Sequence, residues 1–177
     1  MLVVAHFKEA LLKAGHQLAA VGIAFQTKTS WTAADTRELL ASPPRTVLAV
    51  LAKTLPVDRE ESDDRASRAD GPIISLRVFD LHVLAEENER ILRFANGLPV
   101  PTRIAASVSF EDPHMAVFAK PWVKTMMATM GMKADEPIDS PMVSSGLARA
   151  LKKLAKKATG NMPSDSMQEW MKRNLRE

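Results

Sequence analysis

The chain has 177 residues and contains no cysteine. This absence excludes disulfide bonds, thiolate zinc sites and cysteine nucleophiles, and it suits a reducing compartment. No stretch approaches the roughly 18 consecutive apolar residues of a membrane-spanning helix. The N-terminus also lacks the basic and then apolar segments of a secretory signal. We therefore expect a cytoplasmic protein whose stability comes from packing.

The sequence also lacks the usual motifs of nucleotide, metal and acid–base sites. Its seven glycines are scattered singly, so none begins the glycine-rich loop that cradles phosphates in ATPases. The acidic run at residues 60–64 lies in a polar segment, where solvation prevents the pKa tuning that acid–base catalysis requires. The histidines are far apart in the sequence and show no metal-ligand spacing: His6, His16, His82 and His114. We therefore expect no cofactor, no metal site and no catalytic residues, so this chain alone is not expected to be an enzyme.

The first half of the chain alternates between short apolar runs and helical patterns. Such alternation predicts parallel strands joined by right-handed crossovers, the construction of a three-layer α/β domain. The expected strands are residues 2–7, 23–26, 47–51, 73–76, 81–84 and 104–110, and the expected helices are residues 8–21, 32–40 and 86–95. Gly22 is placed to end the first helix, and Ser30 or Thr32 to cap the second.

Two features divide the rest of the chain. Residues 56–72 are polar, charged and bracketed by prolines, which predicts a surface loop. Beyond Pro113 the chain is mostly helical in pattern. At 46% hydrophobic residues, the chain can bury one core with a small helical appendage. We therefore predict an α/β domain at residues 1–112 and a helical, methionine-rich, basic region at residues 113–177.

Positive charge is concentrated at the C-terminal end. The net charge is +3, but residues 144–177 hold eight basic residues against three acidic ones. A helix is predicted over residues 143–158, with apolar positions at Leu147, Leu151, Leu154 and Ala158 and a basic surface that includes Lys152, Lys153, Lys156 and Lys157. This helix either packs on its own domain with solvated lysines or contacts a protein, a membrane surface or nucleic acid. Because it carries no aromatic residue to stack on bases, nucleic acid is the least favoured of these partners.

Methionine is also concentrated in the second region, where nine of the ten methionines lie at or after residue 115. Methionine clusters either line grooves that accept varied apolar peptides or fill irregular helical cores. We take as candidate partner-binding residues the following set: Met126, Met127, Met130, Met132, Met142, Lys152, Lys153, Lys156 and Lys157. A last helix is predicted at residues 165–175, capped by Ser164 or Asp165. The apolar face of this helix, with Trp170, either docks on its own domain or is open to a partner.

Two segments carry a resemblance to a known family. Residues 110–119 (FEDPHMAVFA) and 126–143 (MMATMGMKADEPIDSPMV) resemble the junction between the second motor domain and the helical scaffold of SecA, the preprotein translocase ATPase. The family typically has Ser-x-Glu-Asp-x-Leu-Met-x-x-Phe, then Met-x-x-Leu-Gly and a helix that begins with valine. Residues that hold those places include Ser109, Met115, Phe118, Gly131 and Val143. Residues 81–90 (LHVLAEENER) resemble the family's Leu-His-Val-x-x-Thr-Glu-Arg segment, and the resemblance extends more faintly over residues 2–157.

The resemblance implies a RecA-like three-layer domain with a mainly parallel sheet, followed by a helical C-terminal extension. It also shows what this sequence does not have. The family's first motor domain, with its phosphate loop, is not in this sequence. The Gly-Arg-Gly-Thr-Asp step after the third strand is replaced by residues 53–58 (KTLPVD). The arginine-rich segment that contacts the γ-phosphate is replaced by residues 96–103 (NGLPVPTR), whose single arginine cannot form that clamp.

Three hypotheses follow. The first is a SecA-like domain without an ATPase site of its own, a protein-binding module in or derived from protein export, whose methionine-rich basic region contacts a protein partner or an unfolded peptide. The second is a subunit of a split ATPase that a separate phosphate-loop domain completes. The third is a nucleic-acid-binding accessory protein that uses the basic tail. Peripheral membrane contact and self-association remain open as further interactions.

Overall fold

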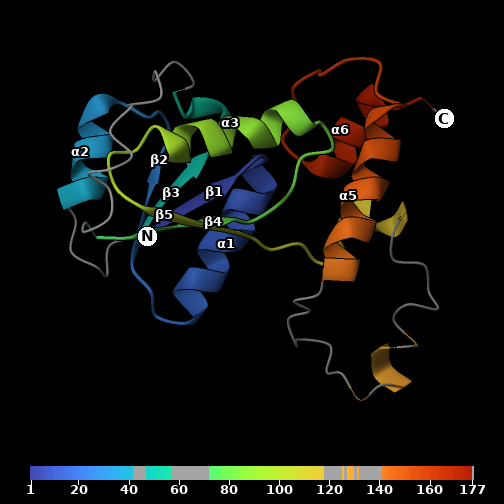
Figure 1. Ribbon diagram of the computed structural model, residues 1–177, viewed down its shortest axis with the longest axis horizontal. Coiled ribbons are helices and arrows are strands. Elements are labelled where there is room, and N and C mark those ends of the chain that lie inside the picture. Colours follow the sequence, from blue (N-terminus) through green and yellow to red (C-terminus); the bar gives the residue numbers. More distant parts are fainter. Residues whose placement is uncertain are drawn as a thin grey trace. The chain divides into compact units, whose positions relative to one another are not determined.

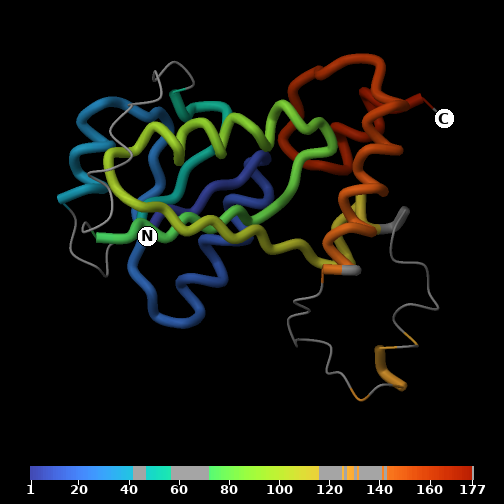
Figure 2. Tube along the Cα trace, in the orientation of Figure 1, coloured from blue at the N-terminus to red at the C-terminus, as the bar shows by residue number. Residues whose placement is uncertain are grey.

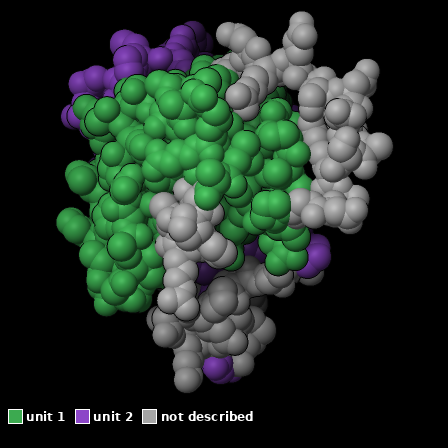
Figure 3. All heavy atoms as spheres, turned by 90° about the vertical axis from the view of Figure 1, so that its left-hand side faces the viewer, with its two compact units in different colours: residues 1–107 green, residues 108–177 purple. Residues whose placement is uncertain are grey.

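The structure is a computed structural model that describes residues 1–41, 47–56, 72–117, 125, 127–129, 131 and 141–176. The chain forms two compact units, unit 1 (residues 1–107) and unit 2 (residues 108–177), which Figure 3 shows in green and purple. Among the described residues, no helix is long and apolar enough to cross a membrane.

Unit 1 is built on a sheet of parallel strands (Figure 1). The sheet has the order β2-β3-β1-β4-β5, and every neighbouring pair is parallel. The strands are β1 (Leu2–Ala5), β2 (Phe25–Lys28), β3 (Val47–Leu51), β4 (Ile74–Val78) and β5 (Thr102–Ala106). Strands β1 and β3 are buried along nearly their whole length, as expected of central strands covered on both faces. The predicted α/β fold with a mainly parallel sheet, like that of a RecA-like domain, is therefore confirmed.

Helices connect most of the strands of unit 1. The tube in Figure 2 shows the chain passing through a helix between β1 and β2, between β2 and β3, and between β4 and β5. These helices are α1 (Lys8–Ala20), α2 (Ala33–Ala41) and α3 (Ala85–Asn96), and a short 3-10 turn, η1 (Ala52–Thr54), follows β3. Helix α1 lies on one face of the sheet, and α2 and α3 lie on the other. Of the polar loop expected at residues 56–72, residues 57–71 lie outside the described part of the chain.

The two faces of the sheet carry different cores. One core joins alternate residues of β1, β3 and β4 to α2 and α3, and includes Leu48, Leu76, Leu39 and Phe94. The other core lies under α1 and joins Val3, Ala49 and Ala14 to partly buried residues such as Phe25. Because successive strand residues point to opposite faces, the same short strands supply both cores.

Two glycines shape α1. Gly22 has a φ of +72°, and the amide of Ile23 donates to the carbonyl of Leu18 at 2.9 Å, so the predicted helix end at this glycine is confirmed. Gly15 lies against the ring of Phe25, where an added Cβ would approach the ring Cζ to 2.9 Å. A glycine that lowers helix propensity at this position thus allows α1 to approach β2 closely.

The strand expected at residues 81–84 is wrong. These residues form an irregular turn before α3. The amide of His82 donates to Asn88 Oδ1 at 2.9 Å, and the amide of Leu84 donates to His82 Nδ1 at 3.1 Å. Because side chains of this turn and of α3 accept both amide protons, the segment pairs with no strand.

Unit 2 contains the 3-10 turn η3 (Pro113–Val117) and the helices α5 (Pro141–Ala155) and α6 (Met167–Asn174). Its described core includes Met115, Leu147, Leu154, Met167 and Trp170, all less than a tenth exposed. A bridge between Ala158 and Leu175 joins the chain after α5 to the end of α6.

Candidate functional site

The structure describes only part of the methionine set proposed from the sequence. Met126, Met130 and Met132 lie outside the described residues, and Met142 lies in the first turn of α5, where its side chain is not described. Met127 is half-buried in a short helical segment. Elsewhere in the unit, Met115 and Met167 are buried. For these two residues, the core-filling interpretation is correct.

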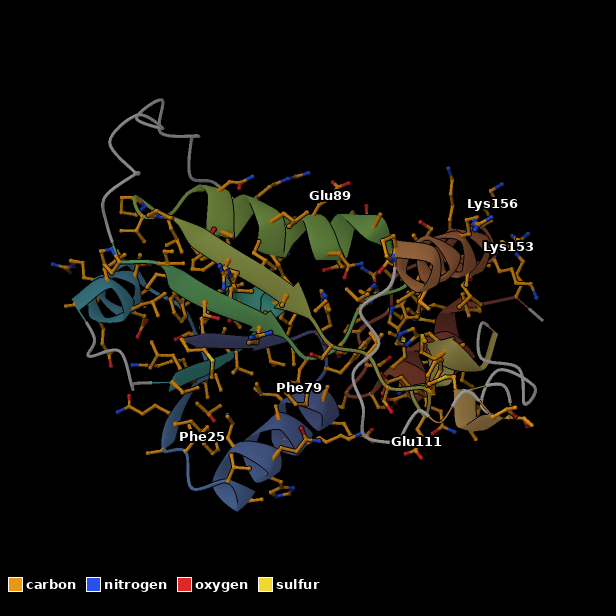
Figure 4. The ribbon with its side chains drawn as sticks, turned by 60° about the horizontal axis from the view of Figure 1, so that its bottom comes forward. Phe25, Phe79, Glu89, Glu111, Lys153 and Lys156 are labelled. Atoms are coloured by element: carbon orange, nitrogen blue, oxygen red, sulfur yellow. The ribbon has the colours of Figure 1, made fainter. Side chains whose placement is uncertain are left out.

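The predicted lysines form an exposed surface at the carboxyl-terminal end of α5. We define the α5 basic surface as Arg149, Lys152, Lys153, Lys156 and Lys157, all of which are exposed. Leu147, Ala150 and Leu154 are buried on the opposite side of the helix. Figure 4 shows Lys153 and Lys156 projecting outward there. Within the described part of the chain, no carboxylate forms an ion pair with these five residues.

A hydrogen-bonded clip holds the segment that follows α5. Asn174 is fully buried at the end of α6. Its Oδ1 accepts from the amide of Met162 at 2.6 Å, and its Nδ2 donates to the carbonyls of Met162 at 3.1 Å and of Trp170 at 2.9 Å. The amide of Arg176 donates to the carbonyl of Lys157 at 3.0 Å. The end of the α5 basic surface is therefore fixed to α6. Sequence reasoning missed Asn174, because its partner Met162 is 12 residues away along an irregular loop.

Trp170 belongs to the core of unit 2. It is 1% exposed, and its Nε1 donates to Asn161 Oδ1 at 2.8 Å. Of the two interpretations that the sequence left open, docking within the protein is thus correct, and the alternative of an apolar face open to a partner is wrong at this residue. The α6 cap is Ser166, whose Oγ accepts from the amide of Glu169 at 3.2 Å, and neither Ser164 nor Asp165 takes that place.

A second polar arrangement, not predicted from the sequence, lies in unit 1 where β1 and β4 end. We define the switch-point cluster as His6, Asp80, His82 and Asn88. The chain leaves β1 towards one edge of the sheet and leaves β4 towards the other, which makes this the topological switch point where α/β proteins often bind ligands. The backbone amide of His6 donates to Asp80 Oδ1 at 2.7 Å, and the rings of His6 and His82 have centroids 5.4 Å apart.

Asn88 determines which ring nitrogen of His6 carries the proton. Its Nδ2 donates to the carbonyls of His82 at 2.7 Å and Leu84 at 3.2 Å, so its Oδ1 is the acceptor that faces His6 Nε2 at 3.0 Å. His6 Nε2 therefore carries the proton. Burial is the largest effect on this ring and, with the neighbouring His82, it lowers the pKa of His6 to about 3, although the hydrogen bond to Asn88 acts in the opposite direction. His6 is thus neutral at physiological pH.

Sequence reasoning missed the proximity of His6 and His82, because 75 residues separate them in the chain. The histidines were set aside because they are far apart in the sequence, yet parallel strands bring the residues that follow β1 and β4 to one edge of the sheet. The position of both histidines at or soon after apolar runs predicted to form a parallel sheet was the sequence signal that could have revealed their proximity. Among the described residues, no group of three or more metal-ligating side chains has the geometry of a metal site.

The segments that replace the expected nucleotide motifs lie apart from each other. Lys53 is exposed in η1, directly after the carboxyl end of β3. Arg103 lies near the amino end of β5, in register with Ser75. Ligands of open α/β sheets bind at the carboxyl ends of strands. Arg103 is therefore at the wrong end of its strand to reach such a ligand.

Comparison with known proteins gives two partial similarities. No protein-family model matches the chain. It is 34% identical over 105 residues, 54% of the chain, to protein translocase subunit SecA 1 of Rhodopirellula baltica. It is 42% identical over 43 residues, 24% of the chain, to protein translocase subunit SecA of Koribacter versatilis. These alignments cover 8% and 4% of the two relatives, so the chain spans only a small part of their length.

Proposed function

We propose that this chain is a SecA-like, protein-binding module in or derived from protein export, and that it acts in the cytoplasm without an ATPase site of its own. Unit 1 corresponds in this proposal to a degenerate second motor domain. The similarity to SecA subunits over about half of the chain supports the connection with export. The replaced segments and the position of Arg103 support the absence of a γ-phosphate clamp.

The α5 basic surface is the main structural support for the proposed binding role. Its five cations are exposed and form no ion pair with described residues, and the clip at Asn174 fixes its carboxyl-terminal end. A segment whose backbone is already ordered loses little backbone entropy when it binds, and clustered charges steer acidic partners electrostatically. In the proposal, this surface and the methionines predicted from the sequence contact a protein partner or an unfolded export substrate.

The test is a binding measurement with a permanently unfolded, acidic model protein such as reduced and carboxymethylated α-lactalbumin. We expect the intact chain to bind the labelled probe and the variant with glutamine at Lys152, Lys153, Lys156 and Lys157 to bind at least about tenfold more weakly. A control that removes three exposed cations of unit 1, with glutamine at Lys13, Arg37 and Lys53, should bind normally. Equal binding by both variants would remove the α5 basic surface from the proposal.

The methionines require a separate variant. Replacing Met126, Met127, Met130, Met132 and Met142 by serine should weaken binding of an uncharged apolar peptide and leave the salt dependence of the acidic probe unchanged. If the serine variant binds the apolar peptide as well as the original chain does, then only the charged part of the proposed contact remains.

A further inference from the structure

On one face of the unit 1 sheet, two of the five strands have no covering helix among the described residues of unit 1. Helix α1 packs on β1, β2 and β3, while α2 and α3 join the core on the other face, an arrangement visible in Figure 1. Right-handed crossovers cause this distribution, because only the connection from β1 to β2 runs towards the β2 edge of the sheet. On the α1 side, no described helix of unit 1 therefore covers β4 and β5.

Four residues make up this open area, which we call the β4–β5 face: Ser75, Arg77, Arg103 and Ala105. Their neighbours Ile74, Leu76, Val78 and Ile104 pack into the core on the other face, so alternation places these four on the α1 side. Ser75 is in register with Arg103, and Arg77 with Ala105. Both arginines are exposed, whereas Ser75 and Ala105 are half-buried. Phe79, labelled in Figure 4, packs against the α1-side core just beyond β4.

Within the part of the chain that the structure describes, no acidic side chain pairs with the positive charge on this face. Neither Arg77 nor Arg103 forms an ion pair with any carboxylate among the described residues. The register keeps the two arginines from lying directly opposite one another, an arrangement that would be destabilising. Parallel sheets are almost always covered on both faces. Within the described residues of unit 1, this sheet face therefore has two guanidinium groups without an ion-pair partner and no covering layer.

We propose that the β4–β5 face is an interaction surface that accepts an acidic helix of a partner protein. Helices are the elements that cover parallel sheets, and the small side chains of Ser75 and Ala105 allow a helix to approach closely. Five-residue strands are about 16 Å long, which matches about three helical turns. Arginine binds carboxylates through two parallel hydrogen bonds, so glutamate or aspartate on the helix complements Arg77 and Arg103.

Other occupants fit less well. The α5 basic surface of this chain carries the same sign of charge as Arg77 and Arg103 and is repelled by them. The four residues of the β4–β5 face include no aromatic side chain on which a nucleic-acid base would stack. They also include no large apolar side chain that would insert into a lipid surface. The inference does not depend on the proposed export role, because it uses residues of unit 1 alone.

A direct test uses a designed helical peptide of glutamate, leucine and alanine as the probe. Fluorescence anisotropy measures its binding to the full chain carrying glutamine at all five residues of the α5 basic surface, so that this surface does not contribute. Combining Arg77→Glu with Arg103→Glu should raise the Kd at least about tenfold. Arg37→Glu, at an exposed arginine of α2, should leave it unchanged. A peptide with glutamine in place of glutamate should not bind.

A second arm identifies the natural occupant. A photo-crosslinking amino acid at Ser107, which is exposed just after β5, should capture an acidic helical segment of another protein in lysate, and the double arginine variant should lose that product. An unchanged Kd in the double variant would overturn the proposal. So would tighter binding of single-stranded DNA than of the peptide at Arg77 and Arg103. Cross-links only to a second copy of this chain would also contradict it. Unchanged circular dichroism of each variant excludes unfolding as the cause.

Discussion

At the scale of single residues, His6 couples the stability of unit 1 to pH. Its pKa is about 3 in the folded protein, against about 6.5 when unfolded, so the unfolded state binds the proton more readily between these values. Stability is therefore full above pH 6.5 and falls as the pH decreases towards 3. We expect His6 to cost roughly 2 kcal/mol between pH 7 and pH 5. Urea unfolding at both pH values measures the loss.

The control for this prediction separates His6 from other titrating groups. His6→Gln keeps a donor for Asn88 Oδ1 and removes the titration, so its unfolding free energy should depend less steeply on pH. Replacing the exposed His16 by glutamine should not have this effect. Titration of the His6 ring near pH 6.5, followed by NMR, would contradict the expected burial of a neutral imidazole.

His114 gives a second prediction at this scale. The side chain is 1% exposed, and neither ring nitrogen has a hydrogen-bond partner among the described residues. Burial lowers the pKa of His114, although Asp112 acts in the opposite direction. His114→Leu should therefore stabilise unit 2 by about 1 kcal/mol at pH 7. The stabilisation of the leucine variant relative to the original protein should be larger at pH 5. At that pH the original protein loses stability because His114 is protonated in its unfolded state, whereas leucine does not titrate.

Hydrogen exchange of the α6 amides in the full chain measures this gain without unfolding unit 1. His114→Asn serves as a comparison, because it keeps a polar group in the same buried position. A leucine variant whose α6 amides exchange faster than those of the original chain would show that His114 has a favourable partner.

At the scale of secondary-structure elements, local chemistry predicted some boundaries and missed others. Thr32 was one of two caps expected for α2, and its Oγ1 does accept from the amide of Asp35 at 3.3 Å. The strand expected at residues 81–84 failed because Asn88, on the following helix, accepts the amide proton that a strand would share. A side chain on a later element decides that outcome, and the hydrophobic pattern does not encode it.

The N-terminal cap of α6 provides a direct test of how well local sequence predicts element boundaries. Ser164→Ala removes a cap expected from the sequence, whereas Ser166→Ala removes the hydroxyl that accepts from the Glu169 amide. We expect the Ser166 change to destabilise unit 2 by about 1 kcal/mol and the Ser164 change to be close to neutral. Exchange of the Glu169 amide proton measures both effects. Equal costs for the two serines would mean that the first turn of α6 is not held by Ser166.

At the scale of the whole molecule, the three candidate regions differ in how far the sequence could predict them. The α5 lysines follow from helical periodicity alone, because one helix determines which side they share. The switch-point cluster and the β4–β5 face depend on strand order, which joins His6 to His82 and Arg77 to Arg103 across long stretches of chain. The sequence predicted the parallel sheet but not the order of its strands.

The last prediction concerns the independence of unit 1. Both of its cores, and every described strand of its sheet, lie within residues 1–107. A segment that contains its complete core should fold alone. We therefore expect a fragment of residues 1–107 to unfold cooperatively, with amide chemical shifts in β1 and β3 that match those of the full chain. A fragment that has helical circular dichroism but lacks dispersed amide signals would show that unit 1 needs residues beyond 107 for its packing.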